Sequence, residues 1–130
     1  MILALRTDSP TAELILATPD GTIIERESWL AERRLAHELL GKLESLLGRH
    51  DTSWKQLTGL VVFMGPGSFT GLRIGITVMN TIAYSERLPI VGTREDSWFE
   101  NGTQRLQLGE NDQIVLPEYG APAHITTPRK

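Results

Sequence analysis

The chain has 130 residues, a net charge of −3 and no cysteine. This length suits one compact domain, and the lack of cysteine excludes disulfides and thiol chemistry. A mildly acidic chain lacks the clustered Lys and Arg of a free-standing nucleic-acid-binding module. No stretch reaches the roughly 20 apolar residues that span a membrane, and MILALRTDSP is not a signal peptide. We therefore expect a cytoplasmic protein without membrane contact.

Three short apolar stretches at the N-terminus predict an antiparallel meander. Residues 2–6 and 12–17 are typical of strands, and residues 22–27 predict a third strand. Turn residues at 7–10 and Pro-Asp-Gly at 19–21 separate the three strands.

The middle of the chain alternates helices and strands. A helix is predicted from residue 28 or 29 to about 49, because the stretch is rich in helix formers. The near-continuous apolar residues 57–64 predict a strand buried on both faces. A helix over about 70–86 and a strand at 89–92 complete a βββαβαβ order.

The pattern weakens after residue 93. Residues 97–106, SWFENGTQRL, are compatible with a short helix and a turn, and residues 113–116 predict one more strand. Residues 117–130 contain three prolines and no period, so they are expected to be extended.

Both predicted helices carry more apolar surface than packing on one sheet requires. The second helix has an apolar arc about 200° wide, against the stripe of about 100° that suffices for a surface helix. Its two stripes are Leu72, Ile76, Met79 and Ala83, and Ile74, Val78 and Ile82. The surplus indicates a partner surface, with packing of the helices on each other and on the tail as the alternative.

Residues 65–71, GPGSFTG, join the strand at 57–64 to the second helix. Glycine-rich turns of this kind bind phosphates in many enzymes, because backbone amides at the helix start attract an anion. The lysine of GxxxxGK[ST] is absent, and the glycines are spaced GxGxxxG rather than GxGxxG. The spacing favours a structural turn with Ser68 or Thr70 as helix N-cap, while anion binding stays open.

No constellation of residues predicts catalysis or a metal. His37, His50 and His124 lack metal-ligand spacing. Ser68 lacks the GxSxG context, and no His and Asp are placed to suggest a triad. We therefore predict no catalytic residue, no metal site and no cofactor.

The signature GPGSFTGLRIG, between the strands LTGLVVFM and LPIVG, resembles the TsaB (YeaZ) family. The opening ILALRTDSP and the helix RRLAHELLGKLESLL match as well, so that the resemblance covers residues 1–95. It implies a single α/β lobe of the actin-like ATPase (ASKHA, ribonuclease-H-like) fold with a mixed five-stranded sheet. Family members usually carry a second lobe, which residues 96–130 would replace with a short tail.

The resemblance also implies a function. TsaB proteins are catalytically inert partners of the transferase TsaD, which makes N6-threonylcarbamoyladenosine at position 37 of tRNA. TsaE joins a larger complex, a homodimer through the helices is possible, and tRNA is contacted only indirectly. The family's first strand usually carries Asp where this chain has Arg6, which argues against hydrolysis of ATP.

The family pairs through its two N-terminal helices, so the expected partner interface lies there. Its predicted residues are Leu35, Leu39, Leu43, Leu46, Leu72, Ile76, Met79 and Ala83. The predicted glycine-rich loop comprises Gly65, Pro66, Gly67, Ser68, Phe69, Thr70 and Gly71. The alternative function is a minimal nucleotide-binding ATPase or phosphotransferase that uses this loop.

Overall fold

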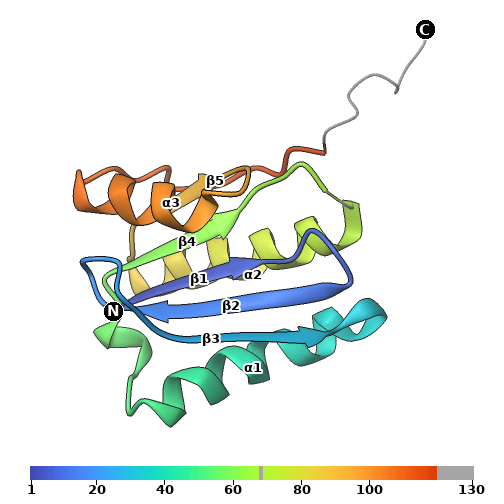
Figure 1. Cartoon of the computed structure of the whole chain (residues 1–130), viewed down its shortest axis with the longest axis horizontal. Coiled ribbons are helices and arrows are strands. Elements are labelled where there is room, and N and C mark those ends of the chain that lie inside the picture. The colour runs from blue at the N-terminus through green and yellow to red at the C-terminus, as the bar shows by residue number, and fades with distance from the viewer. Residues whose placement is uncertain (68, 120–130) are drawn as a thin grey trace, which may run out of the picture.

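The chain folds around one mixed five-stranded sheet (Figure 1). The computed structural model describes residues 1–67 and 69–119, without the side chain of Phe69. The strands are β1 (Ile2–Arg6), β2 (Thr11–Ala17), β3 (Ile23–Leu30), β4 (Gly59–Phe63) and β5 (Ile90–Thr93). The helices are η1 (Glu32–Arg34), α1 (Leu35–Arg49), η2 (Trp54–Gln56), α2 (Phe69–Glu86) and α3 (Trp98–Gln107). The predicted α/β fold and its βββαβαβ order are confirmed.

The sheet has the order β3-β2-β1-β4-β5. β1 and β2 are antiparallel, as are β2 and β3, whereas β4 runs parallel to both β1 and β5. Every residue of β4 is buried, because helices cover both faces of the parallel part of the sheet. This explains why the sequence of β4 is apolar without alternation.

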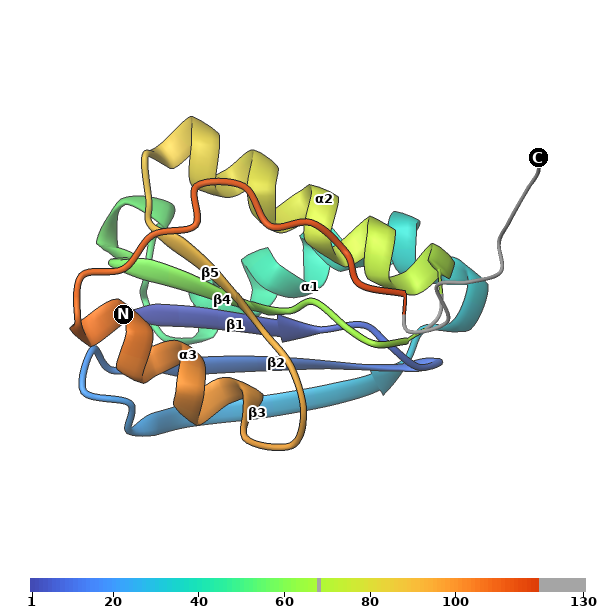
Figure 2. The ribbon, with the colours of Figure 1, turned by 90° about the horizontal axis from the view of Figure 1, so that it is seen from above.

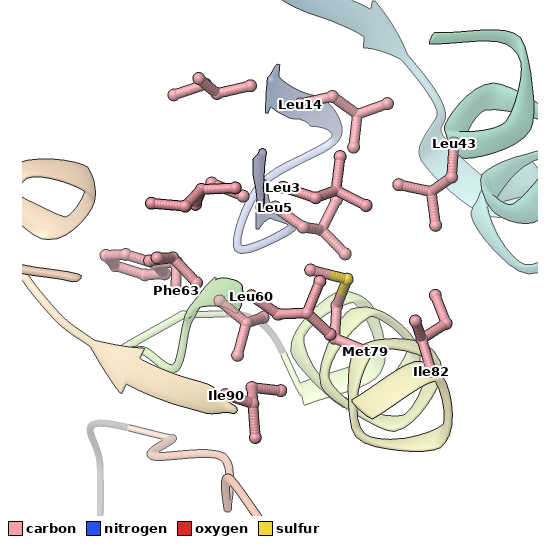
Figure 3. Packing of buried hydrophobic residues seen from close by; sticks show 14 of the residues in the cluster. Leu3, Leu5, Leu14, Leu43, Leu60, Phe63, Met79, Ile82 and Ile90 are labelled. Atoms are coloured by element: carbon pink, nitrogen blue, oxygen red, sulfur yellow. The ribbon is translucent and has the colours of Figure 1, made fainter. Parts of the chain in front are cut away.

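The helices form two layers around the sheet (Figure 2). Leu3, Leu5 and Leu60 lie on the face that packs against Leu43 of α1 and Met79 of α2 (Figure 3). Val61, the residue after Leu60, instead contacts Gly102 of α3. Because successive residues of a strand point to opposite faces, α1 and α2 cover one face of the sheet and α3 covers the other.

Two predicted elements differ in the structure. The first helix begins at Leu35 rather than at residue 28 or 29, because β3 continues to Leu30, which pairs with Thr11 of β2. Pairing with β2 outweighs the helix propensity of this stretch, since strand formation depends mainly on tertiary context. Residues 113–116 form no strand, so that prediction is wrong.

Residues 110–119, here called the C-terminal strap, cap the outer edge of β5. Asp112 N–H donates to the Ile90 carbonyl at 2.8 Å, and the Asn111 side chain accepts from Ile90 N–H at 3.0 Å. The Asp112 carboxylate accepts from Gly92 N–H at 2.9 Å. Two side chains and one backbone N–H of the strap therefore satisfy backbone groups of β5 that a sixth strand would otherwise pair.

Asn80 of α2 holds the middle of the strap. Its amide donates to the Val115 carbonyl and accepts from Val115 N–H, both at 2.9 Å. Val115 is 3% exposed, and Trp98 and Phe99 of α3 are buried in the same core. Residues 96–119 thus pack with residues 1–95 in one unit, whereas the remainder of the predicted tail lies outside the described residues.

The Asn80 contact yields a stability prediction. Asn80→Ala removes both hydrogen bonds and leaves the Val115 backbone groups unpaired, which should lower the free energy of unfolding by about 1–3 kcal/mol. Urea denaturation measures this value. Thr77→Ala, at an exposed position of the same helix, serves as the control and should change it by less than about 0.5 kcal/mol. Equal effects of the two substitutions would contradict the role of Asn80.

The strap also carries an ion pair that predicts a pH dependence. Burial raises the pKa of Asp112, but hydrogen bonds from Arg105 and from Gly92 N–H outweigh it and hold that pKa below its ordinary value. The Arg105 guanidinium lies 2.5 and 3.0 Å from the two carboxylate oxygens of Asp112. A depressed carboxylate pKa contributes stability above the unfolded pKa, and this stability is lost as the pH falls through the folded pKa.

Between about pH 6 and about pH 3, the wild-type chain should therefore lose more unfolding free energy than Asp112→Asn, which has no carboxylate to protonate. Urea titrations at the two pH values measure the difference. The same loss in both proteins would show that Asp112 contributes nothing to the acid sensitivity.

Candidate functional site

The glycine-rich loop lies at the carboxyl edge of the sheet. β1 and β4 are parallel neighbours, so the turn after β1 and the loop after β4 meet at one edge. In open α/β sheets, this edge is where ligands usually bind. The side chains that lie at this edge therefore indicate whether the loop could belong to an enzyme site.

The turn between β1 and β2 fills the space beneath the loop. Thr7 is fully buried, and its hydroxyl donates to the Gly71 carbonyl at 2.8 Å. A Cβ at Gly75 would collide with the Thr7 side chain, and a Cβ at Gly67 would collide with Asp8. Glycine at 67 and 75 is thus explained by close approach of the protein's own turn.

Arg6, at the end of β1, is engaged within the chain. Its guanidinium lies 2.7 and 3.1 Å from the two carboxylate oxygens of Asp8 and 4.0 Å from the centre of the Phe63 ring. The hydrogen bond to Asp8 is the main cause of a raised pKa of Arg6. The two charges at the end of β1 therefore neutralise each other.

A polar cavity of about 700 Å³ adjoins this ion pair. Its charged lining consists of Arg6, Glu95 and Asp96, and its other walls are Phe63, Pro66, Ser97 and Asn101. Phosphate binding requires cations or free amides, whereas here the carboxylates outnumber a guanidinium that is already paired. Among residues 1–67 and 69–119, no three His, Cys, Asp or Glu side chains are grouped to hold a metal ion. Among the described residues, the lining of this cavity therefore offers a phosphate group no unpaired cation.

The histidines and the residues of the glycine-rich loop lie in different parts of the structure and form no common site among the described residues. His37 is exposed on α1, and His50 lies 2.6 Å from Glu25 at the end of that helix. Pro66 lines the polar cavity, while Thr70 and Gly71 line a hollow beside α1. Ser68, the side chain of Phe69 and His124 lie outside what the structure describes.

The eight predicted interface residues lie in the core, so this choice of residues requires correction. Each is between 0 and 4% exposed, and Figure 3 shows Leu43 and Met79 facing the sheet. They form the central stripe of each helix, and this stripe covers the helices' own sheet. In this fold they offer no surface to a partner.

The apolar surface that remains comes from the neighbouring stripes, here called the α1/α2 face. Its members are Ala36, Arg73, Ile74, Thr77 and Val78, which line one hollow, and Leu40, which lies one turn after Ala36 on α1. Leu40 is 50% exposed, and Ile74 and Val78 are half-buried. Hollows of about 530 and 260 Å³ meet at Ile74. The second apolar stripe of the α2 sequence indicated this surface, but sequence alone did not show which stripe faces the sheet.

No helix in the described part of the chain has the length and apolar character to cross a membrane.

Comparison with known proteins places the chain in a family. Residues 29–95 match the family model described as TsaD, tRNA N6-adenosine threonylcarbamoyltransferase. The tRNA threonylcarbamoyladenosine biosynthesis protein TsaB of Bacillus subtilis (strain 168) is 36% identical over 89 residues, covering 68% of this chain and 38% of that protein. TsaB of Escherichia coli (strain K12) is 31% identical over 111 residues, covering 81% of this chain and 47% of that protein.

Among solved structures, YeaZ from Pseudomonas aeruginosa aligns with a TM-score of 0.67 and 26% identity, covering 72% of this chain and 43% of that one. The chain thus spans less than half the length of these relatives. The shared architecture confirms the predicted single lobe of the actin-like, ribonuclease-H-like fold. The signature at 65–75, the sheet order and these likenesses agree that the chain belongs to the TsaB (YeaZ) family.

Proposed function

We propose that this chain is a non-catalytic scaffold that binds TsaD and supports the formation of N6-threonylcarbamoyladenosine in tRNA. The α1/α2 face carries this proposal, because it is an apolar surface that the chain's own core leaves uncovered. Family membership supports the choice of partner, since the matching model describes TsaD and the curated relatives are biosynthesis proteins for the same nucleoside.

The geometry of the face suits a helix-mediated contact. Leu40 lies one turn after Ala36 on α1, and Val78 lies one turn after Ile74 on α2, so each helix presents a short apolar row. α1 and α2 contact each other on one side of the sheet. A helix of the partner could lie along the hollows between them, as in other interfaces where a helix fills a groove.

The carboxyl edge of the sheet supports the absence of catalysis. The turn after β1 packs closely against Gly67 of the glycine-rich loop. The cavity beside the loop is lined by carboxylates and by a guanidinium that is already paired. The alternative, a nucleotide-binding ATPase or phosphotransferase of the same fold, would need free cations or amides at this edge. The charge of the cavity disfavours that alternative.

The other partners follow from the family resemblance. TsaE is proposed to join a larger complex with TsaD, and tRNA is proposed to be contacted through TsaD. A second copy of the chain could occupy the α1/α2 face and would then compete with TsaD. The two arrangements differ in mass, which makes them separable in solution.

Leu40→Glu tests the docking face. A charge in the middle of an apolar contact should weaken the 1:1 complex with TsaD from the same organism by about tenfold or more, because the carboxylate would be buried without a partner. Light scattering detects the complex, and calorimetry measures its affinity.

Leu108→Glu is the matched control, since Leu108 is 71% exposed just beyond the end of α3, on the other side of the sheet. It should leave the affinity for TsaD within about twofold. A wild-type chain that does not bind TsaD would refute the proposed function. Equal effects of the two glutamates would place the contact elsewhere.

A further inference from the structure

Arg73 stands apart from its surroundings on the α1/α2 face. It is the charged member of a hollow that is otherwise lined by Ala36, Ile74, Thr77 and Val78. Its side chain is exposed and forms no ion pair or hydrogen bond with residues 1–67 or 69–119. Arg6, Arg49 and Arg105 each pair with a carboxylate of the chain. Arg33 and Arg87, like Arg73, form no ion pair with a described residue, but neither lines this hollow.

The fold does not account for a cation at this position. Arg73 lies in the second turn of α2, towards the N-terminal end, where the helix dipole gives a cation no stabilisation. The carboxylates that line the adjoining hollow are Asp8 and Glu32. Asp8 is held by Arg6, and Glu32 forms no ion pair with a described residue. The helix therefore carries Arg73 without a stabilising contact from the described residues.

Docking on this face changes the environment of Arg73. A partner that covers Ile74 and Val78 also covers part of Arg73, which lines the same hollow, and removes water from it. A buried charge without a counter-charge is strongly unfavourable, whereas a guanidinium with a carboxylate can form two parallel hydrogen bonds. A partner that fits this face must therefore supply a carboxylate within reach of Arg73.

We propose that Arg73 is the specificity-determining cation of the α1/α2 face and that the docking helix of TsaD presents an aspartate or glutamate to it. This inference rests on the proposed function and adds the chemistry of the contact. Arginine suits this task because its planar guanidinium binds a carboxylate with two hydrogen bonds and is frequent in the centres of interfaces.

Arg73→Met tests the inference, because methionine keeps the length and apolar stem and removes the charge. Calorimetry with TsaD from the same organism, at about 50 and about 300 mM salt, compares four chains. The wild type should bind, and its affinity should fall with salt. Arg73→Met should bind about tenfold or more weakly and lose most of the salt dependence, because the carboxylate of the partner is left unpaired.

Two further variants separate charge from fit. Arg73→Lys keeps the charge and should recover part of the lost affinity. Arg87→Met removes one exposed arginine just beyond the end of the same helix, and its affinity should stay within about twofold of the wild type. Thermal unfolding of all four chains checks that they are equally folded.

The possible results are distinguishable. Arg73→Met binding as tightly as the wild type, or weakened no more than Arg87→Met, would overturn the inference and leave the proposed function standing. A wild-type chain that does not bind TsaD would refute both. A homodimer that is weakened by both Arg73→Met and Glu32→Gln would make a second copy the occupant and overturn the choice of TsaD.

Discussion

The hydrogen bond from the Thr7 hydroxyl to the Gly71 carbonyl joins the first turn of the sheet to the start of α2. Thr7 is fully buried, and Gly75 lets the helix approach it closely. The contact ties the first turn of α2 to the turn after β1, and the buried stripe of the helix packs on the sheet beside it. Gly75 lies on the side of α2 that faces the sheet, next to the buried Leu72 and Ile76, so the outward side carries Arg73, Thr77 and Val78.

The same contact lies at the edge of the sheet where ligands usually bind in this kind of fold. The turn that carries Thr7 and Asp8 fills the underside of the glycine-rich loop, and Asp8 also holds Arg6 over the Phe63 ring. The guanidinium at this edge is therefore paired within the chain. We propose that this loop positions α2 and that the outward stripe of that helix is the functional surface.

The order of apolar and turn residues along the chain predicted the elements that form from local sequence. The strands, the glycine-rich turn and the second helix follow from apolar runs and turn residues, and they lie within a few residues of their predicted bounds. The sequence pattern could not predict structure that depends on long-range contacts. β3 extends to Leu30 because it pairs with β2, and Val115 lies outside any strand, where it hydrogen-bonds the Asn80 amide. The interface residues were misassigned for the same reason, since two apolar stripes of one helix look alike until the sheet is placed.

Hydrogen–deuterium exchange of the chain, with TsaD and separately with magnesium ATP, tests the central claim most directly. It reports on the backbone of the α1/α2 face and of the glycine-rich loop in one experiment. The account predicts that TsaD slows exchange in residues 36–42 and 73–81, and that magnesium ATP leaves residues 65–71 unchanged. Protection of the loop by magnesium ATP, with no effect of TsaD on the helices, would contradict the account and favour a nucleotide-binding enzyme.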